Sequence, residues 1–126
     1  MATLPDETLR KILLQLQQTV NDSSRAISAT KAQNSSKERD RRVVQLTSKE
    51  ISEIPPNAGA KFYQGVGKMF VQEPRSKIEA NLKNQEKELT NDIANLGKKL
   101  KYHEKQYNDS QNQLRDIFHA AESRQA

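Results

Sequence analysis

The chain has 126 residues, of which 33% are apolar and 29% are charged, and its formal net charge is +5. It is short enough for a single domain and too poor in apolar residues for a thick globular core, since about 45–50% is usual in globular domains. Cysteine is absent, which excludes disulfides, thiol catalysis and zinc–thiolate sites.

The N-terminal segment, Met1 to Asp6, has no basic stretch followed by an apolar run, so we expect no signal peptide. No apolar run approaches the ~20 residues that a membrane-spanning helix needs. These features lead us to expect a soluble protein of the cytoplasm.

The first predicted element is a long helix over residues 6–54. The segment contains neither Pro nor Gly, Asp6 and Glu7 supply an acidic first turn, and Pro55 and Pro56 end it. Alternating steps of four and three residues select a seam typical of a coiled coil. The seam positions are Leu9, Leu13, Leu16, Val20, Ser23, Ile27, Thr30, Asn34, Lys37, Arg41, Val44 and Ser48.

The middle segment, residues 55–73, is predicted to form a loop and a β-hairpin. Residues 61–66 and 68–72 are rich in β-formers, and Gly67 marks a tight turn between them. Apolar side chains alternate onto both faces, and a lone two-stranded hairpin is only marginally stable in water. We therefore expect hairpins from several chains to assemble through Phe62, Tyr63, Val66, Gly67, Met69, Phe70 and Val71.

The last predicted element is a second long helix over residues 75–123. Pro74 precedes it, Ser76 and Glu79 have capping-box spacing, and Gly97 is its one weak point. The same alternating steps select a matching seam. Its positions are Leu82, Glu86, Leu89, Ile93, Leu96, Leu100, His103, Tyr107, Ser110, Leu114, Ile117 and Ala121.

The two helices are expected to pair antiparallel, with the numbers of paired residues summing to 130. A slip of one heptad also matches the seams, and the connector length favours the first register. Only the layers nearest the termini are apolar on both sides, such as Leu13 with Ile117 and Leu16 with Leu114. The rest of the coil has at most one strongly apolar residue per layer, so we expect a flexible shaft.

A candidate binding surface lies near the termini. Its residues are Leu4, Leu9, Ile12, Leu13, Leu16, Leu114, Ile117 and Phe118. Two interpretations stay open for the side chains that lie off the seam, Leu4, Ile12, Leu14 and Phe118: a broad seam covers them, or they form an exposed apolar patch that grasps other proteins.

The sequence offers no basis for an enzyme, a metal site or a cofactor. The carboxylates lie on open helices without a pocket, and His103 and His119 have no metal-ligand partners at useful spacing. Gly65 and Gly67 lack the other residues of a phosphate-binding loop, so a turn is the better interpretation. Two functions without catalysis fit these elements: a coiled-coil tether, and a nucleic-acid-binding coil suggested by the net charge.

The hairpin also carries a family resemblance. Residues 61–72, with Tyr63, Gly67 and the apolar run that follows, resemble the hairpin of β-class prefoldin subunits, and the helix–hairpin–helix layout extends the resemblance over residues 1–126. One departure is the polar seam at Asn34, Lys37 and Arg41, which weakens the expectation of tight shaft packing.

The resemblance implies a heterohexamer of α-type and β-type subunits whose hairpins join in a double β-barrel body bearing coiled-coil arms. It implies an ATP-independent holdase co-chaperone that binds unfolded actin- or tubulin-like proteins near the arm termini. It also implies delivery of these clients to the cytosolic chaperonin, with no cofactor and no nucleic-acid or membrane partner.

Overall fold

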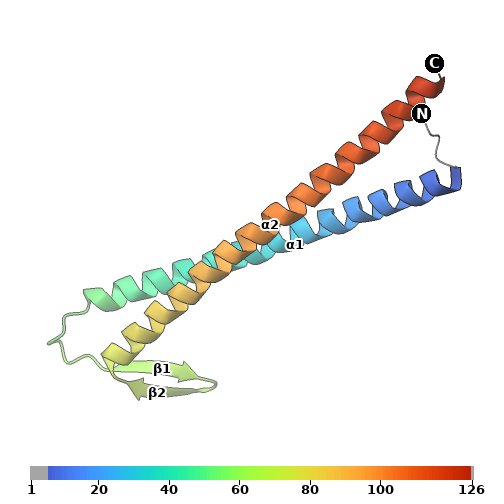
Figure 1. Ribbon diagram of the computed structural model, residues 1–126. Coiled ribbons are helices and arrows are strands. Elements are labelled where there is room, and N and C mark those ends of the chain that lie inside the picture. Colours follow the sequence, from blue (N-terminus) through green and yellow to red (C-terminus); the bar gives the residue numbers. More distant parts are fainter. Residues whose placement is uncertain (1–5, 126) are drawn as a thin grey trace. The chain divides into compact units, whose positions relative to one another are not determined.

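The computed structural model describes residues 6–125, and their side chains as far as Glu122 (Figure 1). The elements follow in the order α1 (Asp6–Glu53), β1 (Phe62–Val66), β2 (Met69–Glu73) and α2 (Arg75–Gln125). This confirms the predicted mostly α fold of two long helices joined by a hairpin. Helix α1 ends one residue earlier than predicted and α2 ends two residues later.

Prolines set the helix boundaries on both sides of the hairpin. Because a residue before proline is disfavoured in helical conformation, Pro55 excludes Ile54 from α1. The amide of Ile54 still donates to the carbonyl of Ile51 at 3.1 Å, which closes the last turn. At the start of α2, the carbonyl of Pro74 accepts hydrogen bonds from the amides of Lys77 at 3.1 Å and Ile78 at 3.2 Å.

The chain divides into two compact units, which are described separately. The terminal unit comprises Met1–Gln33 and Leu96–Ala126, and so contains the first part of α1 and the last part of α2. The hairpin unit comprises Asn34–Asn95, with the remaining parts of both helices and the β-hairpin.

The terminal unit is held together by a narrow seam. All predicted seam positions in it are buried or half-buried except Ala121, which is exposed, so the outermost predicted layer is open on the α2 side. Val20 and Leu114 are its only buried apolar side chains among the described residues, at 7% and 8% exposed. Ser23 and Thr30 are each 2% exposed. Their small side chains let the two backbones approach closely, and the unit therefore has a thin core.

The hairpin unit joins its helices through polar contacts. Lys37 Nζ lies 3.3 Å from Asp92 Oδ2, and Gln45 Nε2 donates to Glu86 Oε1 at 3.0 Å. The residue numbers of these pairs sum to 129 and 131, whereas a one-heptad slip would change the sum by seven. The contacts thus agree with the predicted antiparallel register. Among the polar seam positions, they give partners to Lys37 and Glu86, whereas Asn34 Oδ1 is buried without a hydrogen-bond partner in the described part of the chain.

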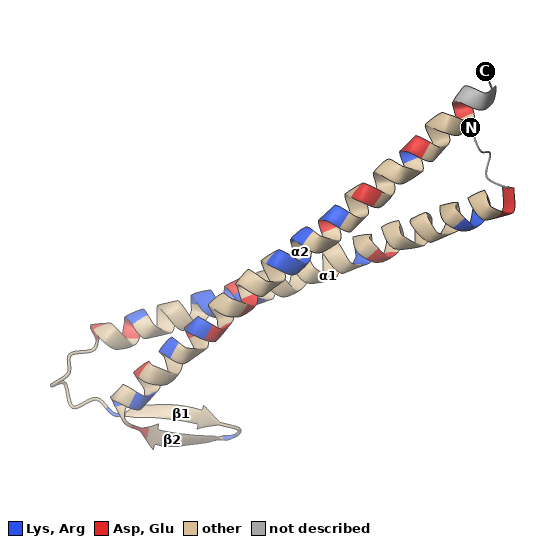
Figure 2. Ribbon diagram, viewed as in Figure 1, with Lys and Arg blue, Asp and Glu red and all other residues tan. Residues whose placement is uncertain are grey.

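Charge is distributed along both helices. Figure 2 shows Lys and Arg interspersed with Asp and Glu on α1 and α2, with no continuous basic stripe in the part of the chain that is described. None of the described helices carries an apolar stretch long enough to span a membrane.

Candidate assembly and binding surfaces

The hairpin is regular, with a tight two-residue turn. β1 and β2 pair antiparallel from Phe62 opposite Glu73 to Val66 opposite Met69. Between them Gly67 has a φ of 61°, while no residue other than glycine has a positive φ in the described chain. Positive φ at the first central position alone is the pattern of a type II′ turn, which suits the twist of a hairpin and favours glycine.

Apolar side chains stand on both faces of this hairpin, as predicted from the alternation. One face carries Phe62, Gln64, Val66, Met69, Val71 and Glu73, and the other carries Tyr63, Gly65, Phe70 and Gln72. Four of these side chains are largely exposed: Tyr63 at 56%, Val66 at 59%, Met69 at 68% and Phe70 at 77%. Val71 is 39% exposed and Phe62 is half-buried. We call the four largely exposed side chains, together with Val71, the hairpin surface.

A cross-strand contact organises the second face. A Cβ placed on Gly65 would lie 3.7 Å from Phe70 Cε1, so the Phe70 ring rests directly over the glycine backbone. Beside it, Tyr63 and Gln64 form with the first turns of α2 a pocket of about 110 Å³, whose helix side includes Ile78 and Leu82. These contacts cover only one end of the hairpin.

The base of the hairpin is organised by Arg75, the first residue of α2. Its Nη1 donates to the carbonyl of Ile54 at 2.8 Å and its Nη2 to the carbonyl of Ile51 at 2.7 Å. Its Nε forms an ion pair with Glu79 Oε1 at 2.8 Å. The guanidinium carbon also lies 5.6 Å from the centre of the Phe62 ring, within cation–π range.

Sequence reasoning did not identify Arg75. It assigned Glu79 to a capping box with Ser76, whereas the Glu79 carboxylate binds the Arg75 side chain. A signal was nevertheless present. The last turn of α1 contains no basic residue, and a cation is the usual partner for the unpaired carbonyls at a helix C-terminus. The next available arginine in the chain is Arg75.

The residues predicted to bind other proteins fall into two groups in the terminal unit. Leu9, Leu13, Leu16 and Ile117 are half-buried and Leu114 is buried, all at predicted seam positions. Ile12, which lies off the predicted seam, is half-buried as well. Phe118 is 57% exposed, and Leu14, which lies off the predicted seam, is 70% exposed. Leu4 lies outside the described residues. The large apolar side chains open to a partner in the terminal unit are therefore Leu14 and Phe118, together with Tyr102, which is 58% exposed.

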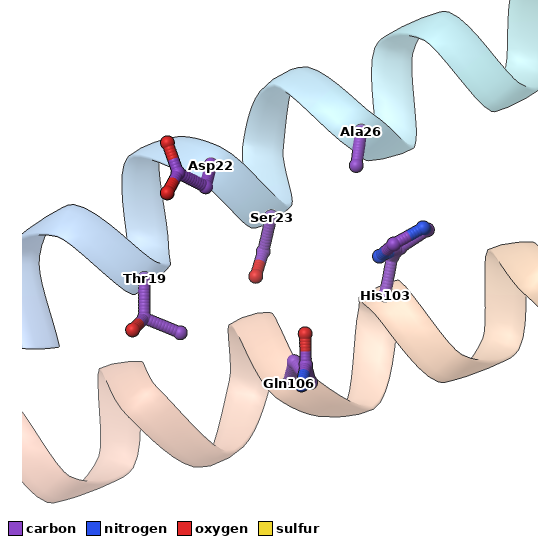
Figure 3. Close-up of a pocket in the computed structure, with 6 residues that line it drawn as sticks. All are labelled: Thr19, Asp22, Ser23, Ala26, His103 and Gln106. Carbon is purple, nitrogen blue, oxygen red and sulfur yellow. The ribbon is translucent and has the colours of Figure 1, made fainter.

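A groove between the helices of the terminal unit brings together residue types that also occur in hydrolase sites. It has a volume of about 360 Å³ and is lined by Thr19, Asp22, Ser23 and Ala26 from α1 and by His103 and Gln106 from α2 (Figure 3). The Ser23 side chain is buried, and the Asp22 carboxylate points away from His103 and accepts a hydrogen bond from Gln18 instead. Within the described chain no hydrogen bond links Asp22, His103 and Ser23, so the groove lacks the geometry of a catalytic triad.

Comparison with known proteins settles the family. The profile of the family described as "Prefoldin subunit" matches residues 14–121, which is most of the chain. The chain is a member of the prefoldin subunit family. Prefoldin subunits are components of a chaperone and are not known enzymes.

Curated relatives and a solved structure agree with this membership. The chain is 26% identical to prefoldin subunit 1 of Tetraodon nigroviridis over 120 residues, covering 95% of this chain and 97% of the relative. It is also 26% identical to prefoldin subunit 1 of Arabidopsis thaliana over 115 residues, covering 91% and 88%. The resemblance of residues 61–72 is to eukaryotic prefoldin subunit 1 in particular, and these relatives bear that name.

The crystal structure of the prefoldin beta subunit from Thermococcus strain KS-1 has a similar fold, with a TM-score of 0.76 at 16% identity, covering 93% of this chain and 96% of that one. The fold of a single hairpin between two long helices thus matches that of this beta subunit. Among the hypotheses left open by the sequence, the family favours the chaperone subunit over the tether and the nucleic-acid-binding coil.

Proposed function

We propose that this chain is one subunit of a hetero-oligomeric prefoldin, a six-chain holdase that binds unfolded proteins without using ATP. In this proposal the chain assembles with α- and β-type prefoldin subunits through its hairpin surface. The complex holds actin- or tubulin-like clients in the cytoplasm and delivers them to the cytosolic chaperonin.

The observation that carries the proposal is that large apolar side chains are exposed on the hairpin, whereas few apolar side chains are buried anywhere in the described chain. The described chain buries only Val20 and Leu114 as apolar residues, yet it exposes Tyr63, Met69 and Phe70 by more than half on one small hairpin. Contiguous exposed apolar surface usually marks an interface. The hairpin also has two unpaired strand edges, since its sheet contains only β1 and β2. Pairing with hairpins of other subunits satisfies both the apolar faces and the edges.

Client holding is assigned to the terminal unit. Leu14 and Phe118 are the most exposed large apolar side chains there besides Tyr102, and neither is needed for the seam. Each such side chain binds an unfolded chain weakly. Several subunits acting together raise the overall affinity while each contact remains reversible. This requires no nucleotide.

The test is suppression of aggregation by the reconstituted complex in the absence of nucleotide. The complex is prepared with this chain carrying Leu14→Ser and Phe118→Ser, and chemically unfolded actin is diluted into it while light scattering is recorded. We expect the complex to assemble normally and to suppress aggregation less well than the wild type. Replacement of the half-buried seam leucines would confuse the result, because it would also loosen the coil.

A matched control variant carries Val43→Ser and Leu46→Ser. These side chains are similarly exposed, at 62% and 53%, and lie on α1 in the hairpin unit. The control should suppress aggregation as the wild type does. Undiminished suppression by the Leu14 and Phe118 variant would remove this subunit's terminal residues from client binding.

A further inference from the structure

We propose that Arg75 is a positioning residue that fixes the hairpin at the end of α1 and thereby prepares it for assembly. This inference rests on the proposed function, because it assumes that the hairpin is the assembly surface. Arg75 is not part of the hairpin surface. In this proposal it acts indirectly, by holding Phe62 and the α1 terminus.

Arg75 joins three elements of the hairpin unit at one point. Two of its nitrogens reach the Ile51 and Ile54 carbonyls at the C-terminal end of α1, at 2.7 and 2.8 Å. Its planar group lies against the ring of Phe62, the first residue of β1, with 5.6 Å between the guanidinium carbon and the ring centre. The side chain itself belongs to the first residue of α2. The α1 terminus, the hairpin base and the α2 start therefore share one guanidinium.

The contacts suit arginine for physical reasons. The last carbonyls of a helix lack intrahelical donors and carry partial negative charge, so a cation is favourable there. A guanidinium has several donors in a fixed plane and can bind two carbonyls while stacking on an aromatic ring. Glu79 accepts the remaining Nε hydrogen at 2.8 Å and holds the plane in place. A lysine ammonium cannot make all of these contacts together.

A second ion pair ties the other strand to α2 but is more exposed. Lys77 Nζ lies 3.2 Å from Glu73 Oε2 at the end of β2, with the lysine side chain 59% exposed. The Arg75 side chain is only 24% exposed. Less exposed charge contacts are screened less by salt, so Arg75 is the stronger of the two links. Among the side-chain contacts given above, only those of Arg75 join the hairpin base to the end of α1.

Fixing the hairpin in advance matters for assembly. A flexible element must be ordered on binding, and this ordering weakens the complex. Loss of the Arg75 contacts should therefore weaken binding to partner subunits by about tenfold to a hundredfold, although the hairpin surface itself is unchanged.

The experiment compares full-length Arg75→Ala, Arg75→Lys and wild-type chains in two measurements. Hydrogen exchange of the amides in residues 62–73 reports whether the hairpin is held, and titration with the other prefoldin subunits reports assembly. We expect faster exchange confined to the hairpin and the end of α1, together with weaker assembly. Arg75→Lys should be intermediate. Helix content, measured by circular dichroism, should be close to that of the wild type.

Arg42→Ala is the matched control, because Arg42 is exposed on α1 and forms no ion pair or hydrogen bond within the described residues. Unchanged hairpin exchange in Arg75→Ala would overturn the positioning role, whatever the assembly shows. Faster exchange with unchanged assembly would overturn its importance for binding. If Arg75→Ala does not fold, the positioning role can still be tested with Arg75→Lys and Phe62→Leu, because each substitution removes only part of the Arg75 contacts. Failure of the wild-type chain to assemble would instead refute the proposed function.

Discussion

Replacement of Phe70 by serine tests whether the exposed side chains of the hairpin serve assembly with other subunits or folding of the chain itself. Phe70 is 77% exposed, and its only described contact is with the opposite glycine, Gly65. An aromatic side chain presents about 150–250 Å², so most of that area is available to a partner. Full burial of such a side chain contributes about 1.5–3 kcal/mol, and we take about 2–3 kcal/mol as the loss on assembly. This corresponds to about 30- to 150-fold weaker binding.

The assay is sedimentation velocity of the chain titrated with its partner subunits. Phe70→Ser should leave the helix content of the chain unchanged, because the ring is not part of the core, and should shift the assembly midpoint by the factor given above. Val43→Ser, which removes a side chain on α1 that is 62% exposed, is the control and should assemble normally. Wild-type assembly by Phe70→Ser would show that the hairpin is not the interface.

Four further predictions concern stability, each measured by thermal denaturation of the assembled complex. Gly97→Ala should stabilise α2 by about 0.5–1 kcal/mol, because the added methyl group meets nothing within 4 Å. Gly67→Val should destabilise the hairpin by about 1–2 kcal/mol, because the φ of 61° is strained for a β-branched residue. Leu114→Ala should destabilise the terminal unit by about 2–4 kcal/mol, since the side chain is 8% exposed. Lys37→Ala should cost at most about 1 kcal/mol, because its partner Asp92 is also solvent-accessible.

For each of these four substitutions, one stability result would contradict the prediction. A loss of stability in Gly97→Ala would mean that the helix needs a bend at this position. A silent Gly67→Val would contradict the two-residue turn. A silent Leu114→Ala would contradict the narrow seam as the source of stability. A large effect of Lys37→Ala would show that the polar contacts carry more of the coil's stability than their exposure indicates.

The seam could be predicted from the sequence because it depends on a local periodicity. Alternating steps of four and three select positions on one face of a helix, and every position selected on α1 is buried or half-buried. The hairpin was predictable for the same reason, since the alternation and the glycine turn are local signals. Helix ends were accurate to one or two residues because prolines mark the connector.

Arg75 could not be assigned in this way. Its contacts join positions 51, 54 and 62, and they depend on how the chain returns after the loop. Exposure near the termini could be predicted only for seam positions. Ile12 and Phe118 both lie off the predicted seam, yet Ile12 is half-buried and Phe118 is 57% exposed. Periodicity places both side chains beside the seam but does not say how far the facing helix covers them.

We propose that the chain works as one subunit among other prefoldin subunits, joined to them through the hairpin surface. The most direct measurement is native mass spectrometry of the complex purified with a tagged copy of the chain from its own cell. We predict a six-chain particle that contains this chain together with other prefoldin subunits. Recovery of the chain alone, or only with copies of itself, would contradict the account.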